Sequence, residues 1–123
     1  MAASSASFHE DVQKLTPATM DLHRAIVSLM EELEAVDWYQ QRVEATGDDE
    51  LRQILAHNRD EEKEHAAMIL EWIRRHDAKL DAVLHEYLFT SGNIVRIEAA
   101  AAGDNGAAAP AARPTLGSLR GER

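Results

Sequence analysis

The sequence predicts an all-α fold whose main element is an antiparallel hairpin of two helices. Apolar residues recur at spacings of four and three over residues 22–36, and the same spacing runs along residues 51–72. This is the periodicity of helices that bury one face. Neither glycine nor proline interrupts the chain between Pro17 and Gly47. Because the break at Gly47 is short, the two helices must fold back on each other.

The first helix is expected to begin after Thr16, a favoured N-cap residue, with Pro17 at the first helical position. It should span about 30 residues, or roughly 45 Å at ~1.5 Å per residue. Gly47 then suits the left-handed position that commonly ends a helix. Asp48 and Asp49 provide an N-cap and an acidic first turn for the second helix.

The second helix is expected to end near Arg75 and His76, because basic residues favour a helix C-terminus. A shorter C-terminal helix is predicted over residues 77–88. We assign residues 1–98 to one helical domain, in which two long helices leave little core. Residues 99–123 are rich in Ala, Gly and Pro and have few large apolar side chains, so we expect a disordered linker and tail.

The composition excludes several classes of function. The chain of 123 residues has 13 Lys and Arg against 22 Asp and Glu, a formal net charge of -9 that disfavours nucleic acid and anionic membranes and favours cations. It has no cysteine, which excludes thiolate chemistry and disulfides. The N-terminus lacks a signal-peptide pattern and no apolar run reaches ~20 residues, so we expect a soluble cytoplasmic protein.

Acidic side chains of the first helix fall on two faces. At ~100° per residue, Glu32 and Tyr39 lie nearly above one another on the flank of the apolar seam. Glu31 and Glu34 form a separate stripe with Trp38, away from the seam. The seam itself consists of Leu22, Ile26, Leu29, Leu33 and Val36.

Glu62 and His65 occupy the centre of the apolar seam of the second helix. An ionised carboxylate on a buried face costs several kcal/mol unless it is paired. A divalent cation held by this carboxylate and a neutral imidazole would compensate. Three residues apart on a helix, the two side chains converge on one point. The other seam positions are Leu51, Leu55, Asn58, Ile69 and Trp72.

A single Glu-x-x-His pair is common on helices, and its ordinary interpretation is a solvated or hydrogen-bonded pair. Two observations favour a metal site here. The pair lies on the seam, and Glu32 on the neighbouring helix is, like Glu62, 15 residues from Gly47. In an antiparallel hairpin the two carboxylates should therefore lie at similar heights.

The pair also occurs only once. Ferritin-like di-iron sites use a Glu from each of two helices and a Glu-x-x-His from each of two others, all in a four-helix bundle. This chain has one of each and no internal repeat. A two-fold homodimer would bury the seams of both hairpins and complete the bundle, with Glu32, Glu62 and His65 of each chain around two metal ions.

Three stretches carry a resemblance to a known family. MEELEAVDWY at residues 30–39, LAHNRDEEKEHAAMILEW at residues 55–72 and YLFT at residues 87–90 resemble the encapsulated ferritins, bacterial proteins that reside inside encapsulin nanocompartments. The resemblance covers roughly residues 9–96. It implies a ferroxidase that binds Fe(II) at an inter-subunit di-iron centre, oxidises it to Fe(III) with oxygen for storage in the shell, and assembles as a ring of dimers.

The same resemblance assigns site residues. The implied di-iron ligands are Glu32, Glu62 and His65 of both chains. Tyr39 matches a residue beside that centre. A secondary site that attracts metal ions is implied at Glu31 and Glu34, close to Trp38.

The end of the tail carries the few apolar side chains of that segment. Its residues 116–121, LGSLRG, are similar to the cargo-loading peptides by which encapsulated ferritins dock on the inner wall of the shell. This similarity implies that Leu116, Leu119 and Arg120 bind the encapsulin shell protein and place the chain inside a cytoplasmic nanocompartment. Composition alone would favour a terminus without function.

Two other functions fit the same residues. One is a non-catalytic module for binding divalent metal or for assembly, with Zn or Mn in the seam site. The other is a di-iron peroxidase on the same bundle. Sequence does not separate these from a ferroxidase, because the same ligands accept several metals. A further stripe of His57, Glu61 and Glu64 is compatible with a surface metal site or with simple solvation.

Overall fold

The computed structural model describes the backbone of residues 6–107 and the side chains of residues 6–102, and within that range the chain is helical and contains no strand. It divides into two compact units, Met1–His76 and Asp77–Arg123. The first contains a short 3-10 helix and two long helices, and the second contains two shorter helices. The elements are η1 (Val12–Lys14), α2 (Pro17–Ala45), α3 (Asp49–His76), α4 (Ala78–Tyr87) and α5 (Ile94–Ala107).

The helix α2 begins as the sequence predicts. The Thr16 side chain accepts a hydrogen bond from the backbone N–H of Thr19 at 3.1 Å, and Pro17 opens the first turn. The helix ends at Thr46, whose extended backbone (φ −76°, ψ 142°) leaves its N–H bonded to the Arg42 carbonyl. Its 29 residues match the expected length.

The turn between α2 and α3 is built differently from the prediction. Gly47 does not adopt a positive φ, so the expected left-handed ending was wrong; Thr46 leaves the helix in an extended conformation instead. The Asp48 side chain accepts from the N–H of Leu51 at 2.8 Å and so caps α3. The Arg52 guanidinium donates to the carbonyls of Thr46 and Val43, which satisfies helix-end carbonyls that α2 leaves open.

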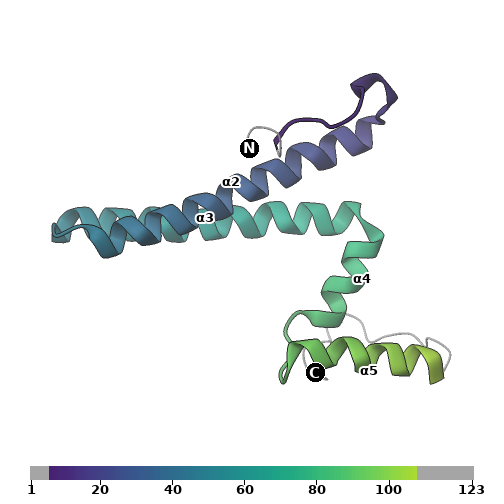
Figure 1. The fold of residues 1–123 in the computed structure, drawn as a ribbon. Coiled ribbons are helices and arrows are strands. Elements are labelled where there is room, and N and C mark those ends of the chain that lie inside the picture. The colour runs from purple at the N-terminus through teal and green to yellow at the C-terminus, as the bar shows by residue number, and fades with distance from the viewer. Residues whose placement is uncertain (1–5, 108–123) are drawn as a thin grey trace. The chain divides into compact units, whose positions relative to one another are not determined.

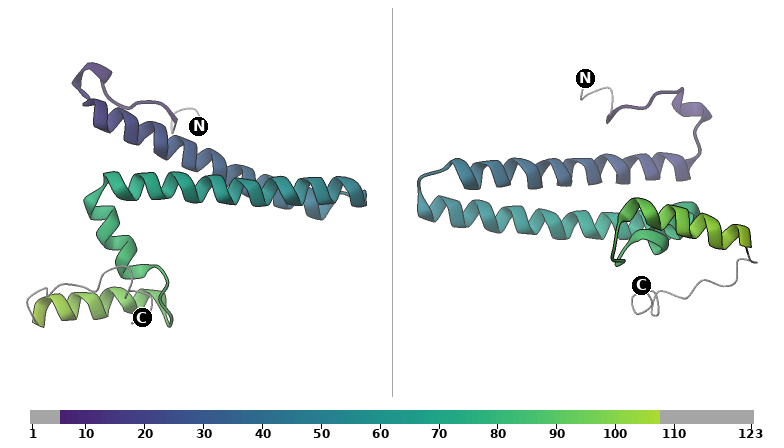
Figure 2. Two further views of the ribbon diagram at one scale, coloured as in Figure 1. Left: turned by 180° about the vertical axis from the view of Figure 1, so that it is seen from behind. Right: turned by 60° about the horizontal axis from the view of Figure 1, so that its bottom comes forward.

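The helices α2 and α3 form the antiparallel hairpin. They lie side by side and diverge toward the open end, away from the turn (Figures 1 and 2). Among the described residues only Ala66 and Ile73 are buried, at 7% and 4% exposure. Seam residues such as Leu33 (55% exposed) and Leu51 (44%) remain accessible. Two helices can cover each other on one side only, so the predicted seams are half-covered within one chain.

The second unit consists of α4 and α5, which contact each other. The Asp77 side chain caps α4 by accepting from the Leu80 N–H at 2.9 Å. The connection between the helices holds two residues with positive φ, Phe89 (61°) and Gly92 (86°). Only Gly92 is of the type that adopts this region without strain.

The helix α5 differs from the prediction of a disordered linker beginning at residue 99, because it continues to Ala107. Alanine has the highest helix propensity of all residues, and the alanine run of this segment outweighs its low content of large apolar side chains. The Asn93 side chain accepts from the N–H of Arg96 at 3.1 Å and so caps the helix start. None of the described helices has the length and apolar character needed to cross a membrane.

Candidate metal centre

Three side chains converge between α2 and α3. Glu32 comes from α2, and Glu62 and His65 lie one turn apart on α3. The His65 Nδ1 atom is 3.0 Å from Glu62 Oε1 and 3.6 Å from Glu32 Oε1. One ligand atom from each residue lies within 4.8 Å of the other two. Within residues 6–102, these three form the one group of three or more His, Asp or Glu side chains that could hold a metal ion.

The antiparallel hairpin places these residues at the same height along its two helices. Glu62 lies near the midpoint of α3, and Glu32 lies at a matching distance from the turn on α2. The two carboxylates are close enough to hydrogen bond to each other. The sequence placed them at similar heights from the register of the turn alone, and the structure brings them together with His65.

The three groups perturb each other's protonation. A hydrogen bond with Glu62, together with partial burial, raises the pKa of Glu32. The pKa of Glu62 is lowered by the hydrogen bonds that it receives from Glu32 and His65. The same bond to Glu62 raises the pKa of His65 above its ordinary value. Of the two carboxylates, Glu32 is therefore the one that holds a proton more readily, and His65 holds its proton more readily than an unperturbed imidazole.

Two oxygen donors and one imidazole nitrogen suit a divalent transition metal. A cation placed among them would supply the positive charge that holds the carboxylates together. Side-chain exposures of 25% for Glu32, 23% for Glu62 and 47% for His65 leave the cluster open on one side. The donors of one chain therefore fit a metal ion but do not enclose it.

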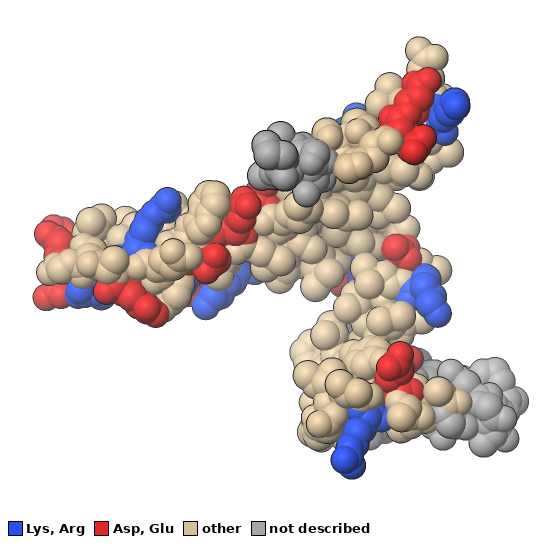
Figure 3. All heavy atoms as spheres, in the orientation of Figure 1, with Lys and Arg blue, Asp and Glu red and all other residues tan. Residues whose placement is uncertain are grey.

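Exposed apolar side chains surround this opening. On α3 the stripe that contains His65 continues with Met68, which is 64% exposed, and Trp72, at 36%. In the other direction it continues with Ile54 (52%) and Leu51 (44%). Figure 3 shows charged side chains near the turn of the hairpin and near the start of α2, with mostly uncharged side chains between them on this face. The cluster thus lies in an apolar surface that nothing covers within the described chain.

The other predicted site residues of α2 do not belong to this group of three ligands. Glu31 and Glu34 are exposed on another face, and Trp38 is 49% exposed. Tyr39 is half-buried, and the Arg42 guanidinium lies over its ring at 5.4 Å from the centroid. Neither Glu31 nor Glu34 belongs to a ligand group of three within the described side chains.

The stripe of His57, Glu61 and Glu64 on α3 has wider separations and more exposed side chains than the cluster. His57 Nε2 and Glu61 Oε2 are 4.0 Å apart, with side chains 71% and 50% exposed. Glu64 is exposed and does not complete a ligand group with them among the residues described. The predicted tail residues Leu116, Leu119 and Arg120 lie outside the described residues.

Sequence reasoning missed one polar contact near the site. Arg59, with a side chain 20% exposed, donates across the hairpin to Gln40 Oε1 at 2.7 Å and is also bonded to Asp60. Gln40 in turn donates to Glu44. This chain ties α3 to α2 one turn from Glu62. The signal for it was Gln40 itself, a polar residue at a position that continues the apolar seam of α2.

Comparison with known proteins places this geometry in context. Residues 7–91 match the EncFtn-like protein family. The chain is 56% identical to an "Encapsulated ferritin-like protein" of Rhodospirillum rubrum, over 99% of this chain and 94% of that protein. It is 33% identical to the "Encapsulin nanocompartment cargo protein EncC" of Myxococcus xanthus, over 92% and 95%. A crystal structure of a Nitrosomonas europaea protein is 62% identical, with a TM-score of 0.69 over 72% of this chain and 97% of the other.

Proposed function

The chain belongs to the EncFtn-like family, and from that premise we propose that it is a ferroxidase. It would oxidise Fe(II) to Fe(III) with dioxygen at a di-iron centre shared by two copies of the chain. The oxidised iron would be stored inside an encapsulin shell. The observation that carries this proposal is the convergence of Glu32, Glu62 and His65 at the centre of an uncovered apolar face.

A second copy is needed to complete the centre. Each chain supplies two carboxylates and one imidazole, and a two-fold contact would double this set around two irons. The same contact would cover the apolar stripe that flanks His65, including Met68 and Trp72. Because each such side chain gains ~1.5–3 kcal/mol when fully buried, the stripe provides a driving force for association. Dimers of this kind would assemble further into a ring.

Fe(II) is the substrate, and when bound each ion gives up one electron to dioxygen. The carboxylates of Glu32 and Glu62 favour this step, because anionic oxygen stabilises Fe(III) more than Fe(II). Iron binding competes with protonation of Glu32 and His65, whose pKa values are both raised, because a metal ligand must be deprotonated. The apolar stripe would limit access of water to the centre once two copies meet.

Other residues receive supporting roles in the proposal. Glu31 and Glu34 would form a secondary site whose negative field concentrates cations near the centre. Tyr39 would lie beside the centre, and Trp38 close to the secondary site. The stripe of His57 and Glu61 with Glu64 would add a weak surface site at most, because two highly exposed side chains 4.0 Å apart hold a cation poorly.

The names of two relatives and the composition of the tail support localisation in a shell. Two of the similar proteins are named as encapsulated or as encapsulin cargo. We assign shell docking to the apolar side chains Leu116 and Leu119 with Arg120, at the end of a segment rich in small residues. Such a segment can act as a flexible tether that presents two leucines to the shell protein.

The direct test adds Fe(II) to the protein without oxygen and then admits oxygen. Absorbance of Fe(III) should appear faster than in protein-free buffer at the same pH and iron concentration. If it appears no faster while iron still binds, the protein is the non-catalytic metal-binding module that the same three ligands would also allow. Zinc added first should slow the reaction, because it competes for the same donors.

A further inference from the structure

Four residues of α3 at a spacing of seven lie along the line where this helix meets α2. They are Arg52, Arg59, Ala66 and Ile73. Each step of seven residues returns to within ~20° of the same direction around a helix. The two arginines, nearer the turn, donate hydrogen bonds to α2, and the other two are the buried apolar side chains. Glu62 and His65 therefore lie where a hydrogen-bonded half of the hairpin meets an apolar half.

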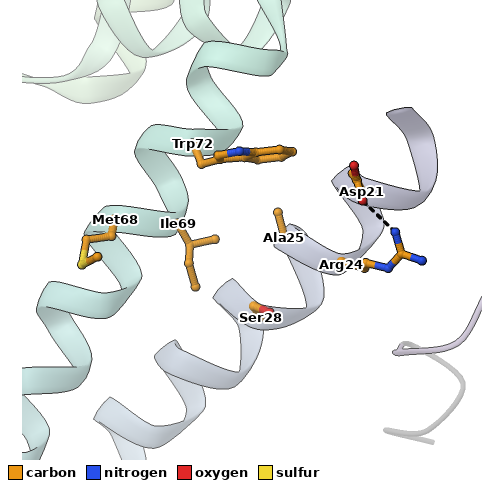
Figure 4. Close-up of a pocket in the computed structure, with 7 residues that line it drawn as sticks. All are labelled: Asp21, Arg24, Ala25, Ser28, Met68, Ile69 and Trp72. Carbon is orange, nitrogen blue, oxygen red and sulfur yellow. Dashed lines mark hydrogen bonds and ion pairs between the residues drawn. The ribbon is translucent and has the colours of Figure 1, made fainter. Parts of the chain in front are cut away.

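The apolar half does not by itself fix the height of one helix against the other. Burial of apolar side chains has no preferred direction, so it resists sliding only where side chains interlock. Toward the open end the helices diverge and leave a groove of about 510 Å³, into which Ala25 of α2 and Ile69 and Trp72 of α3 point (Figure 4). Side chains on either side of such a groove do not interlock. The height of Glu32 against Glu62 is therefore set from the turn side.

The bond from Arg59 to Gln40 lies on that side and is oriented at both ends. The Arg59 Nη1 atom donates to Gln40 Oε1 at 2.7 Å. The Nε and Nη2 atoms of the same guanidinium donate to the Asp60 carboxylate at 2.9 Å and 3.3 Å, which fixes the direction of the third donor. The Gln40 amide in turn donates to Glu44 at 2.7 Å. With a side chain only 20% exposed, Arg59 has little room to move.

The tolerance of this bond matches the tolerance of a metal site. Arg59 lies three residues before Glu62, which is ~4.5 Å along the helix. A hydrogen bond of 2.7 Å weakens once it is stretched beyond roughly 3.2 Å, so this one limits sliding of the helices to about 0.5 Å. Ligands of a metal ion must be held within about the same 0.5 Å. A slip of one residue, ~1.5 Å, would already separate Glu32 from Glu62.

From these contacts we propose that Arg59 is a positioning residue of the metal centre. Through its bond to Gln40 it holds Glu32 of α2 at the height of Glu62 and His65 of α3. It thereby sets the affinity of the centre for a cation and the arrangement of the ligands around it. This inference rests on the metal centre proposed above, and it adds a residue outside the three ligands.

Titration of the full chain with Co(II) tests this role without any oxidation. The visible absorption of bound Co(II) depends on the number and arrangement of its ligands. Arg59→Met and Gln40→Met should each weaken Co(II) binding by about tenfold and alter the spectrum, because loss of a supporting hydrogen bond at a metal site costs 10–100-fold in affinity. The double variant should bind no more weakly than the weaker single variant, because both substitutions remove the same bond.

Two control variants separate positioning from charge and from stability. Lys63→Met also removes one positive charge close to Glu62, but Lys63 is exposed and lies 3.5 Å from Asp60 of its own helix. Its affinity for Co(II) should be unchanged or higher, because loss of a positive charge does not repel a cation. Ile73→Val weakens the buried end of the hairpin at a cost similar to that of one hydrogen bond. It should leave both the affinity and the spectrum unchanged.

The possible failures are distinguishable. Unaltered Co(II) binding in both Arg59→Met and Gln40→Met would overturn the positioning role and leave the centre intact. An equal loss of affinity in Ile73→Val would also overturn it, because stability alone would then explain the effect. A chain that binds no Co(II) at all would overturn the centre and this inference together. Circular dichroism checks that each variant is helical, and Gln40→Met, the milder substitution, decides the outcome if Arg59→Met does not fold.

Discussion

Two faces of α3 carry the same types of residue within a few positions of each other, and they differ in what they meet. Glu62 and His65 face α2, where Glu32 joins them within 3.6 Å of the imidazole. On the outer face, His57 and Glu61 are 4.0 Å apart and have no third ligand among the described residues. The difference teaches that a His and a Glu one turn apart on a helix do not by themselves make the site. The second helix does, by supplying a carboxylate at the same height.

Removing one of the three ligands between α2 and α3 should have the largest effect on the rate of Fe(II) oxidation. Glu62→Ala, His65→Ala and Glu32→Ala should each lower the initial rate of Fe(II) oxidation by about 100-fold or more, because loss of even a supporting group at a metal site costs 10–100-fold. Stopped-flow absorbance measures this rate. The matched variants Glu61→Ala and Glu64→Ala should remain close to the unaltered protein. Full activity in all three inner variants would place the centre elsewhere.

The raised pKa of His65 predicts how metal affinity depends on pH. A metal ion must displace the proton of His65, so affinity should fall on acidification, beginning above the ordinary value of 6.5. Below the raised pKa the loss is about tenfold per pH unit for one proton. Titration with Co(II), which is not oxidised under these conditions, measures the affinity.

The stability of the metal-free protein should change with pH in the opposite direction to the metal affinity. A raised pKa means that protonated His65 stabilises the fold, fully so below its unfolded value of 6.5, and this stabilisation is lost as the pH rises through the folded pKa. His65→Gln should remove both dependences. If the cobalt affinity of the unaltered protein is constant from pH 6 to 8, His65 is not a ligand.

The hydrogen bond from Arg59 to Gln40 joins the two helices of the hairpin, whereas the ion pair between Arg24 and Asp21 lies within α2. Arg59→Met removes a hydrogen bond that joins the two helices and should lower the free energy of unfolding by ~0.5–1.5 kcal/mol. Arg24→Met removes an ion pair within α2 whose side chains are 68% and 58% exposed, and it should change stability less. Urea unfolding of the two variants measures both values. An Arg24 variant that is the less stable of the two would contradict the assigned role of Arg59.

Removing the end of the tail should have the smallest effect on the metal centre. Removing residues 116–123 should leave the rate of oxidation unchanged, because the three ligands lie within the first unit. Co-expression with an encapsulin shell protein should then yield shells without this cargo, whereas the full chain co-purifies with them. Unchanged co-purification would refute docking through Leu116 and Leu119.

Much of the hairpin could be predicted from its sequence, since local signals determine it. Thr16 and Pro17 set the start of α2, and Asp77 sets the start of α4, through caps that depend on neighbouring residues only. The matching heights of Glu32 and Glu62 also follow from local rules, because a short turn leaves little freedom of register. These are the parts of the site that sequence reasoning placed together.

Other features depend on a balance between several small contributions to the free energy, which the sequence pattern does not rank. At Gly47, an extended Thr46 and the capping side chain of Arg52 end the helix without a left-handed residue. In α5, alanine propensity outweighs the lack of apolar side chains. The face around His65 is open because two helices cover each other on one side only, and periodicity does not show what covers the other side.

The central claim is that one chain holds half of a metal centre and a second copy holds the rest. Native mass spectrometry of the protein, with and without Fe(II), tests this most directly. With iron we expect species that contain even numbers of chains and two iron ions per pair of chains, and His65→Ala should lose the bound iron. A protein that binds iron and remains monomeric would contradict the claim.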